Sequence, residues 1–179
     1  MIGELARSVF EHLCHQQPDR AWVIGGEALP FCARCTGVYG GATLAALILP
    51  FARFSPSSRT LYLHGAAMLQ MLVLGFNPIY EPAWLRMLSG SLFSLGAVYF
   101  LWLPVRARLW PEGAGHRWAY VWTAVAAVGV LQILVRVDVS GMATAVEALA
   151  LFGIAALVVL ALMGALAVFA QIVARGKPA

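Results

Sequence analysis

Long apolar stretches dominate the chain and define five candidate membrane spans. A helix needs about 20 mostly apolar residues to cross the hydrocarbon core of a bilayer. Five stretches meet this need, the second interrupted by polar residues and the fifth the longest: 35–54, 60–79, 84–104, 118–137 and 144–174. We therefore predict an all-α integral membrane protein, a bundle of about five transmembrane helices.

The first 34 residues follow a different pattern. Apolar side chains recur there at helical spacing and predict an amphipathic helix over 2–13 that lies on the membrane surface: Ile2, Leu5, Ala6, Val9 and Leu13. Residues 21–29, centred on Gly25-Gly26, predict a short β-hairpin. We expect residues 1–34 to form an extramembrane lid on a transmembrane bundle of residues 35–179, within one domain.

Small residues on the spans indicate close helix packing. Gly37 and Gly41 are four residues apart on the first span, and Gly90 lies among serines on the third. Such faces let helix backbones approach each other in lipid. Gln70 and Gln132 are expected to form interhelical hydrogen bonds, and His64 is expected to be a packed side chain rather than a proton relay.

The composition agrees with a membrane location. Hydrophobic residues make up 61% of the chain and charged residues only 11%, with a mean hydropathy of +0.81. A soluble domain carries about 25% charged residues, so a soluble, disordered or coiled-coil protein is excluded. The net charge is +4, but no block of basic residues is present, so we expect no nucleic-acid partner.

The distribution of basic residues predicts the orientation. Five spans place the two termini on opposite sides of the membrane, and more of the Arg and Lys residues fall on the C-terminal side. The positive-inside rule then places the C-terminus in the cytoplasm and the N-terminal segment outside. We expect the protein in a bacterial cytoplasmic (inner) membrane, with the lipid bilayer as its first partner.

The lid holds the residues best suited to chemistry. All three cysteines and two of the four histidines lie within the first 35 positions: His12, Cys14, His15, Cys32 and Cys35. A Cys-x-x-Cys pair can bind one metal ion together with a Cys-His pair brought back by a hairpin. We predict a metal site of Cys14, His15, Cys32 and Cys35, zinc in the first place or another transition metal. Adjacent Cys14 and His15 can both bind only if the chain is extended there, and His12 is the alternative nitrogen ligand.

Two other uses of the cysteines stay open. A Cys-x-x-Cys at a helix N-terminus has a lowered thiol pKa, so Cys32 and Cys35 could cycle between dithiol and disulfide in a membrane oxidoreductase, with Cys14 as a further thiol. An inert disulfide or inert free thiols are the third reading. The adjacent histidine and the odd number of cysteines favour a metal, whereas the outward orientation favours redox chemistry.

The residues around the cysteines resemble an uncharacterised family of small polytopic membrane proteins, domain of unknown function 2085. The resemblance is carried by Cys14-His15-x-x-Pro18-Asp19-Arg20 and by Cys32-Ala33-Arg34-Cys35-Thr36-Gly37-Val38-Tyr39, with a weaker match at 85–90. Asp19 stands where the family usually has Glu, and His64-Gly65 where it usually has Asp-Gly. The resemblance implies a membrane fold and supplies no activity.

Ionisable residues near the span ends predict a second kind of site. In a five-span topology these residues lie on the same side of the membrane as the lid. The guanidinium group of arginine binds the oxygen atoms of phosphate or carboxylate groups in pairs. We predict a polar pocket for a small anion or an anionic lipid head group, with these candidate residues: Arg20, Arg34, Asn77, Glu81, Arg86, Arg136 and Asp138. The alternative is that Arg86 pairs with Glu81, and Arg136 with Asp138, as interfacial ion pairs.

The function predicted from the sequence is therefore metal binding at the membrane surface over a polar pocket. Hydrolase and nucleotide-binding signatures are absent from the sequence, so no catalytic residue is assigned and enzymatic activity stays open. A small transporter or channel subunit is a further alternative. Five spans without an internal repeat argue against an inverted-repeat transporter, unless a homodimer supplies the second half.

Overall fold

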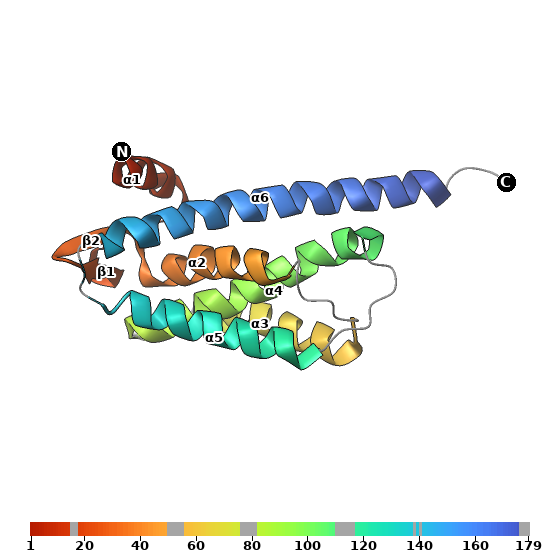
Figure 1. Cartoon of the computed structure of the whole chain (residues 1–179), viewed down its shortest axis with the longest axis horizontal. Helices are drawn as coiled ribbons and strands as arrows, with labels where there is room; N and C mark the ends of the chain where they lie inside the picture. Colours follow the sequence, from red (N-terminus) through yellow and green to blue (C-terminus); the bar gives the residue numbers. More distant parts are fainter. Residues whose placement is uncertain are drawn as a thin grey trace.

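A computed structural model describes residues 1–14, 18–49, 56–75, 82–109, 117–137, 139 and 141–175, and helices account for most of them (Figure 1). In chain order the elements are α1 Ile2–Leu13, the short 3-10 helix η1 Pro18–Arg20, β1 Ala21–Ile24, β2 Glu27–Cys32, α2 Ala33–Ile48, α3 Ser58–Gly75, α4 Ala83–Leu109, α5 Arg117–Leu134 and α6 Met142–Arg175. The predicted helical class with one short hairpin is confirmed for the described part of the chain.

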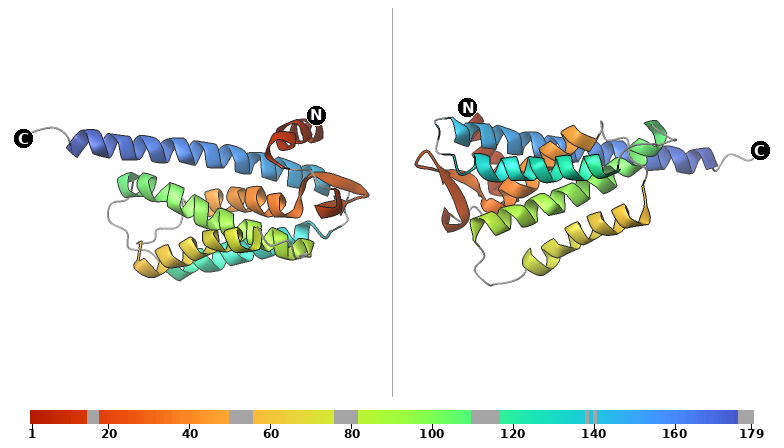
Figure 2. Two further views of the ribbon diagram at one scale, coloured as in Figure 1. Left: turned by 180° about the vertical axis from the view of Figure 1, so that it is seen from behind. Right: turned by 60° about the horizontal axis from the view of Figure 1, so that its bottom comes forward.

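The five long helices run side by side in alternating directions (Figures 1 and 2). Helices α2, α4 and α6 begin at the end of the bundle where β1 and β2 lie, and α3 and α5 end there. We call this the hairpin end. Residues far apart in the sequence, from α1 to the start of α6, therefore meet at one end of the molecule, while the C-terminal end of α6 lies at the other.

Helix α2 lies at the centre of the bundle, against α4, α5 and α6. Its contact with α4 depends on the absence of side chains at two positions. A Cβ atom on Gly37 would collide with the carbonyl oxygen of Met87, and one on Gly90 would collide with the carbonyl oxygen of Arg34. The small-residue faces predicted on these spans therefore do set close backbone approach.

Polar side chains link helices inside the bundle, as the sequence predicted for two glutamines. The amide nitrogen of Gln70 on α3 donates to the carbonyl oxygen of Ser89 on α4 at 2.8 Å, and the Ser89 hydroxyl donates to Gln70 Oε1 at 2.9 Å. Gln132 on α5 donates to the carbonyl oxygen of Trp84 at 3.0 Å. These bonds link α3 and α5 to α4.

His64 is buried, and its ring stacks on Tyr99 with ring centroids 3.9 Å apart. Its Nδ1 lies 2.7 Å from the carbonyl oxygen of Thr60, and because a carbonyl only accepts, this nitrogen carries the proton and donates. The Tyr99 hydroxyl donates to Thr60 Oγ1 at 3.1 Å. The prediction that His64 is a packed side chain agrees with this arrangement.

The lid has the elements that the sequence predicts. Helix α1 spans Ile2–Leu13, and the hairpin turns at Gly25-Gly26, whose φ angles are +63° and +78°. A two-residue turn with both central φ angles positive matches the twist of the strands, and glycine adopts it without strain. The buried face of α1 differs from the predicted stripe: Ala6 and Phe10 are buried, whereas Ile2, Leu5 and Leu13 are exposed.

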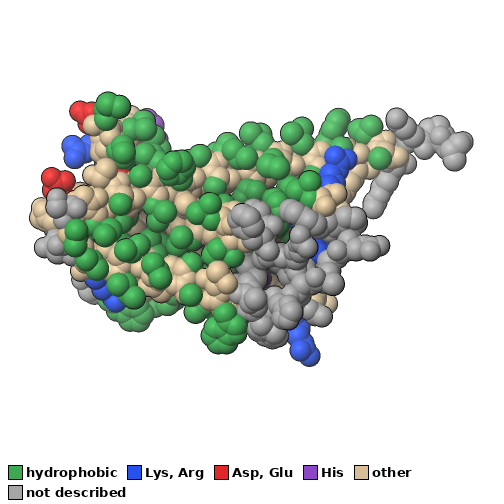
Figure 3. Space-filling model, viewed as in Figure 1, with side chains coloured by type: hydrophobic (Ala, Val, Ile, Leu, Met, Phe, Trp, Pro, Cys, Tyr) green, Lys and Arg blue, Asp and Glu red, His purple; other side chains and the backbone are tan. Residues whose placement is uncertain are grey.

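Apolar side chains cover much of the outer surface of the bundle, and charged groups gather near its ends (Figure 3). Among the described residues, two helices are long and apolar enough to cross a membrane on length and composition, Ala83–Leu109 and Met142–Ala174. Only 22% of the apolar window of the second is buried inside the protein, unlike the core helix of a soluble domain. Helix α4 also continues past Pro104, where the sequence predicted the span to end, because a proline removes only one N–H donor and transmembrane helices tolerate this.

Candidate metal centre

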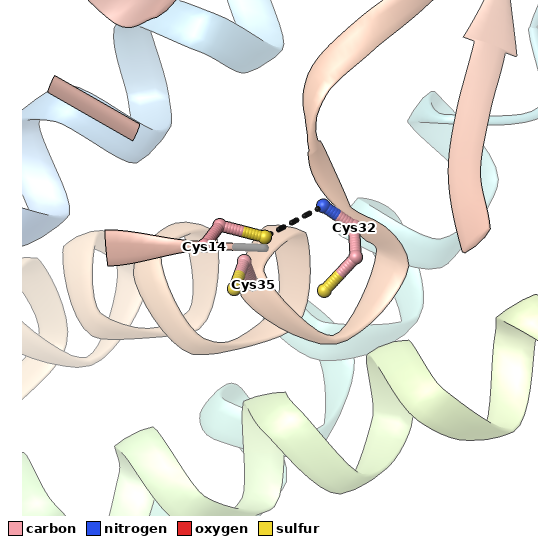
Figure 4. Close-up of side chains that lie close together, drawn as sticks. All are labelled: Cys14, Cys32 and Cys35. Carbon is pink, nitrogen blue, oxygen red and sulfur yellow. Dashed lines mark hydrogen bonds between the residues drawn. The ribbon is translucent and has the colours of Figure 1, made fainter. Parts of the chain in front are cut away.

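The centre of the site is a cluster of the three cysteines at the hairpin end (Figure 4). Their sulfur atoms all lie within 4.8 Å of one another, and all three side chains are half-buried thiols. Two thiolates that share a tetrahedral zinc ion, each at about 2.3 Å from the metal, lie about 3.8 Å apart. The prediction that Cys14 returns to the Cys-x-x-Cys pair is therefore confirmed, and the spacing suits a shared metal ion.

Each cysteine comes from the end of a different element. Cys14 caps the C-terminus of α1, Cys32 ends β2 and caps the N-terminus of α2, and Cys35 lies in the first turn of α2. The backbone N–H of Cys32 donates to Cys14 Sγ at 3.4 Å. The backbone of Cys14 is extended, with φ −136° and ψ 140°, which is the condition for its neighbour His15 to reach the same ion.

An aromatic cluster next to the cysteines holds the three elements in place. Phe10 lies one turn before Cys14, Phe31 directly precedes Cys32, and Tyr39 lies one turn after Cys35. The ring centroids of Phe10 and Phe31 are 4.2 Å apart, and those of Phe10 and Tyr39 are 5.3 Å apart. Such pairs contribute about 0.5–1.5 kcal/mol each beyond the burial of their area. The rings thus bring the ends of α1, β2 and α2 together whether or not an ion is bound.

Crowding of the thiols affects their protonation. The pKa of Cys32 is raised above its ordinary value, chiefly by the hydrogen bond with Cys14, because neighbouring thiols and burial disfavour a second negative charge. A bound cation reverses this balance, since a metal binds the thiolate and releases the proton. The cluster is therefore a poor place for lone thiolates and a good place for a cation.

Of the two candidate nitrogen ligands, His15 and His12, the structure describes only His12. His15 lies outside the described residues. His12 is exposed on α1, where its Nδ1 lies 3.0 Å from the carbonyl oxygen of Ser8, one turn earlier on the same helix. Among the described residues, the metal-ligating group at this place contains the three cysteines alone. The described geometry thus supplies three ligands of the predicted four.

The arginines predicted to bind an anion lie at the hairpin end, but not in one group. Arg34 begins α2, and its Nη2 donates to the carbonyl oxygen of Leu74 near the end of α3 at 3.4 Å. Arg86 lies half-buried in the first turn of α4, one turn before the Gly90 that packs on the Arg34 backbone. Arg20 is exposed beside Asp19 at 3.8 Å. Asn77, Glu81 and Asp138 lie outside the described residues.

Arg136 lies in the turn after α5 and lines a separate pocket of about 210 Å³, together with Trp22 of β1. The sequence contains no signal for Trp22, because its place beside the end of α5 depends on a contact between residues more than a hundred positions apart. It also gave no signal for Phe10, which lies beyond the predicted apolar stripe of α1. Sequence analysis missed Trp22 and Phe10 for the same reason, because the role of each depends on a contact with a distant segment of the chain.

Comparison with known proteins finds short matches. An uncharacterised protein of Methanocaldococcus jannaschii is 41% identical over 44 residues, which cover 25% of this chain and 28% of that protein. An uncharacterised protein of Methanothermobacter thermautotrophicus is 46% identical over 33 residues, 18% of this chain and 30% of the relative. The chain thus spans less than a third of each of these relatives. No solved structure matches it.

The family comparison covers the cysteine cluster and the first helices of the bundle. It includes both parts of the cysteine motif, helices α2 and α3, and α4 as far as Phe100. Residues 14–100 are similar to the model of the family described as "Predicted membrane protein (DUF2085)", which confirms the resemblance found in the sequence.

Proposed function

We propose that this protein is a five-span membrane protein that holds a zinc ion with Cys14, Cys32, Cys35 and His15 at the hairpin end, beside arginines that bind a small or lipid-borne anion. The observation that carries the proposal is the gathering of three sulfur atoms within 4.8 Å from two chain segments, the end of α1 and the start of α2. Three thiolates and one imidazole form a common structural zinc set. Such an ion ties the end of α1 to the start of α2.

Two features support the five spans. Helices α2 to α6 lie side by side in alternating directions, as consecutive spans do (Figure 1). Large apolar side chains on the outward faces of α3, α5 and α6 are also exposed, among them Tyr62, Val73, Trp122, Ile133 and Phe152. Water does not favour such a surface, and a bilayer does.

Elemental analysis of the purified full-length protein tests the metal. We expect about one zinc ion per chain, because one tetrahedral ion uses all three thiolates. Cys14→Ser, Cys32→Ser and Cys35→Ser should each lose most of the metal, since each removes a ligand, and exposed Ser8→Ala on α1 should keep it. Folded protein that carries no metal although it was produced with ample zinc, or metal that survives the cysteine substitutions, would contradict the proposal.

A second candidate function is a membrane thiol-disulfide oxidoreductase. It is favoured by one observation, that Cys32 and Cys35 form a Cys-x-x-Cys pair at the N-terminus of α2 with their sulfur atoms within 4.8 Å of each other. In this reaction Cys32 and Cys35 lose two protons and two electrons and form a disulfide, while a partner disulfide or a quinone is reduced.

Thiol trapping in living cells separates the two functions. If Cys32 and Cys35 bind zinc, acid quenching followed by alkylation should find both of them reduced. At neutral pH, the bound zinc should protect both thiols from alkylation until a chelator is added. A reversible Cys32–Cys35 disulfide whose level follows the growth conditions would instead support the oxidoreductase.

A further inference from the structure

A pocket at the hairpin end lies apart from the cysteine cluster. It has a volume of about 210 Å³ and is formed by two segments, Trp22, Val23 and Ile24 of β1 and Val135, Arg136 and Val137 after α5. The pairing of β1 with β2 is irregular between Ala21 and Val23. The extra residues lie on β2, between Ala28 and Cys32, and Trp22 of β1 lies opposite them, where such an irregularity redirects the side chains.

The polar side chains of this pocket are both hydrogen-bond donors. Trp22 Nε1 is buried and has no hydrogen-bond partner among the described residues. Arg136 is exposed and forms no ion pair with a residue that the structure describes. An indole N–H and a guanidinium can donate but cannot accept. Whatever completes their bonding must therefore bring acceptor oxygens, and the charge of Arg136 favours an anion.

Hydrogen bonds at the end of α5 reduce its repulsion of an anion here. The carboxyl end of a helix carries partial negative charge on its last carbonyl groups. Three of these carbonyls are already bonded, because the backbone N–H groups of Val135, Arg136 and Val137 donate to Leu131, Ile133 and Leu134 at 3.3, 2.9 and 3.3 Å. Of the valines that line the pocket, Val135 is buried and Val23 and Val137 are exposed, so the pocket is open to an anion from solution.

We propose that this pocket binds a phosphate group, with one oxygen accepting the Trp22 indole N–H and another facing the Arg136 guanidinium. The phosphate can be free in solution or part of a lipid head group, since the hairpin end is where head groups lie in the proposed five-span arrangement. The inference rests on the proposed anionic ligand and gives it a location, but it does not depend on the metal ion.

Nuclear magnetic resonance of the indole N–H groups tests the pocket in the full-length protein. The Trp22 indole signal is the one that disappears in Trp22→Phe, which keeps an aromatic ring and removes the donor. Sodium phosphate, added at constant ionic strength against sodium chloride, should shift this signal in a saturable way. Arg136→Gln should weaken the binding at least about tenfold, and Arg136→Lys should retain part of it. Arg108→Gln, an exposed arginine at the other end of the bundle, should change nothing.

A second arm separates the two sources of phosphate. If free phosphate has no effect but bicelles with phosphatidylglycerol shift the Trp22 signal, and bicelles of phosphatidylcholine alone do not, the ligand is an anionic head group. An unmoved Trp22 signal in both arms, or a shift that persists in Arg136→Gln with the other indole signals in place, would overturn the proposal. Because Arg136→Gln leaves the cysteines intact, its metal content should equal that of the wild type.

Discussion

At the scale of single residues, the chemistry depends on where each cysteine stands in its element. Cys14 and Cys32 occupy helix caps, where the backbone is extended and the side chain is free to turn toward a neighbour. Phe10, Phe31 and Tyr39 pack together one residue to one turn away from them. Packing of the aromatic rings therefore holds the segments of the site together, and the thiols give the site its affinity for a cation.

His15, and not His12, is expected to be the fourth ligand. His15 follows an extended Cys14, whereas His12 is exposed and bonded to its own helix. His15→Ala should therefore lower zinc affinity by at least about tenfold, in the range seen when a metal site loses a supporting group, and His12→Ala should leave it unchanged. Competition of each purified variant with a chromogenic chelator measures this. Equal losses in both variants would contradict the assignment.

The sequence predicted the site unevenly at this scale. The spacing of Cys14, Cys32 and Cys35 around a two-glycine turn was enough to predict their meeting, because a hairpin returns the chain to its start. Trp22 and Phe10 could not be placed, since helical and strand periodicity say which residues share a face but not which partner covers it. Of the predicted anion ligands, Arg34, Arg86 and Arg136 lie at the hairpin end, but they face different neighbours.

At the scale of elements, the closest approaches between helices depend on small residues. Lipid is as apolar as a leucine side chain, so close packing and interhelical hydrogen bonds hold helices together in a membrane. Helix α2 meets α4 through Gly37 and Gly90, and α3 meets α4 through Gln70 and Ser89. Both features could be predicted from residue type, but the pairing of partners required the fold.

Gly90 and Gly65 provide a matched pair that tests this packing. A Cβ on Gly90 would collide with the backbone of Arg34, whereas a Cβ on Gly65 would meet no heavy atom within 4 Å. We expect Gly90→Ala to lower the free energy of unfolding by about 1–3 kcal/mol or more, as overpacking does. Gly65→Ala should be neutral or gain about 0.5–1 kcal/mol from helix propensity.

Thermal unfolding of the two purified variants in the same detergent gives the comparison. Equal stability of Gly90→Ala and the wild type would mean that α2 and α4 are further apart than the structure places them.

At the scale of the whole molecule, the proposed architecture is an alternating bundle with its polar chemistry collected at one end. The hydrophobic stretches predicted the positions of α2 to α6 well, because a long apolar run has few alternatives to a helix in lipid. The helix limits were predicted less well, since α4 continues through Pro104 to Leu109. The orientation stays a prediction that rests on the distribution of Arg and Lys.

Reporter fusions test this topology. Green fluorescent protein fused after residue 179 should fluoresce, because the proposed orientation places the C-terminus in the cytoplasm. Alkaline phosphatase fused after residue 137 should be active, because the same orientation places this point outside the membrane. Green fluorescent protein fused after residue 109 should also fluoresce, like the C-terminal fusion. Reversed signals would contradict the orientation, and signals that place both termini on one side would contradict five spans.

X-ray absorption at the zinc edge of the purified full-length protein tests the central claim most directly. The account predicts a coordination shell of three sulfur atoms at about 2.3 Å and one imidazole nitrogen at about 2.0 Å. A shell of oxygen and nitrogen atoms alone, or the absence of zinc from folded protein produced with ample zinc, would contradict it.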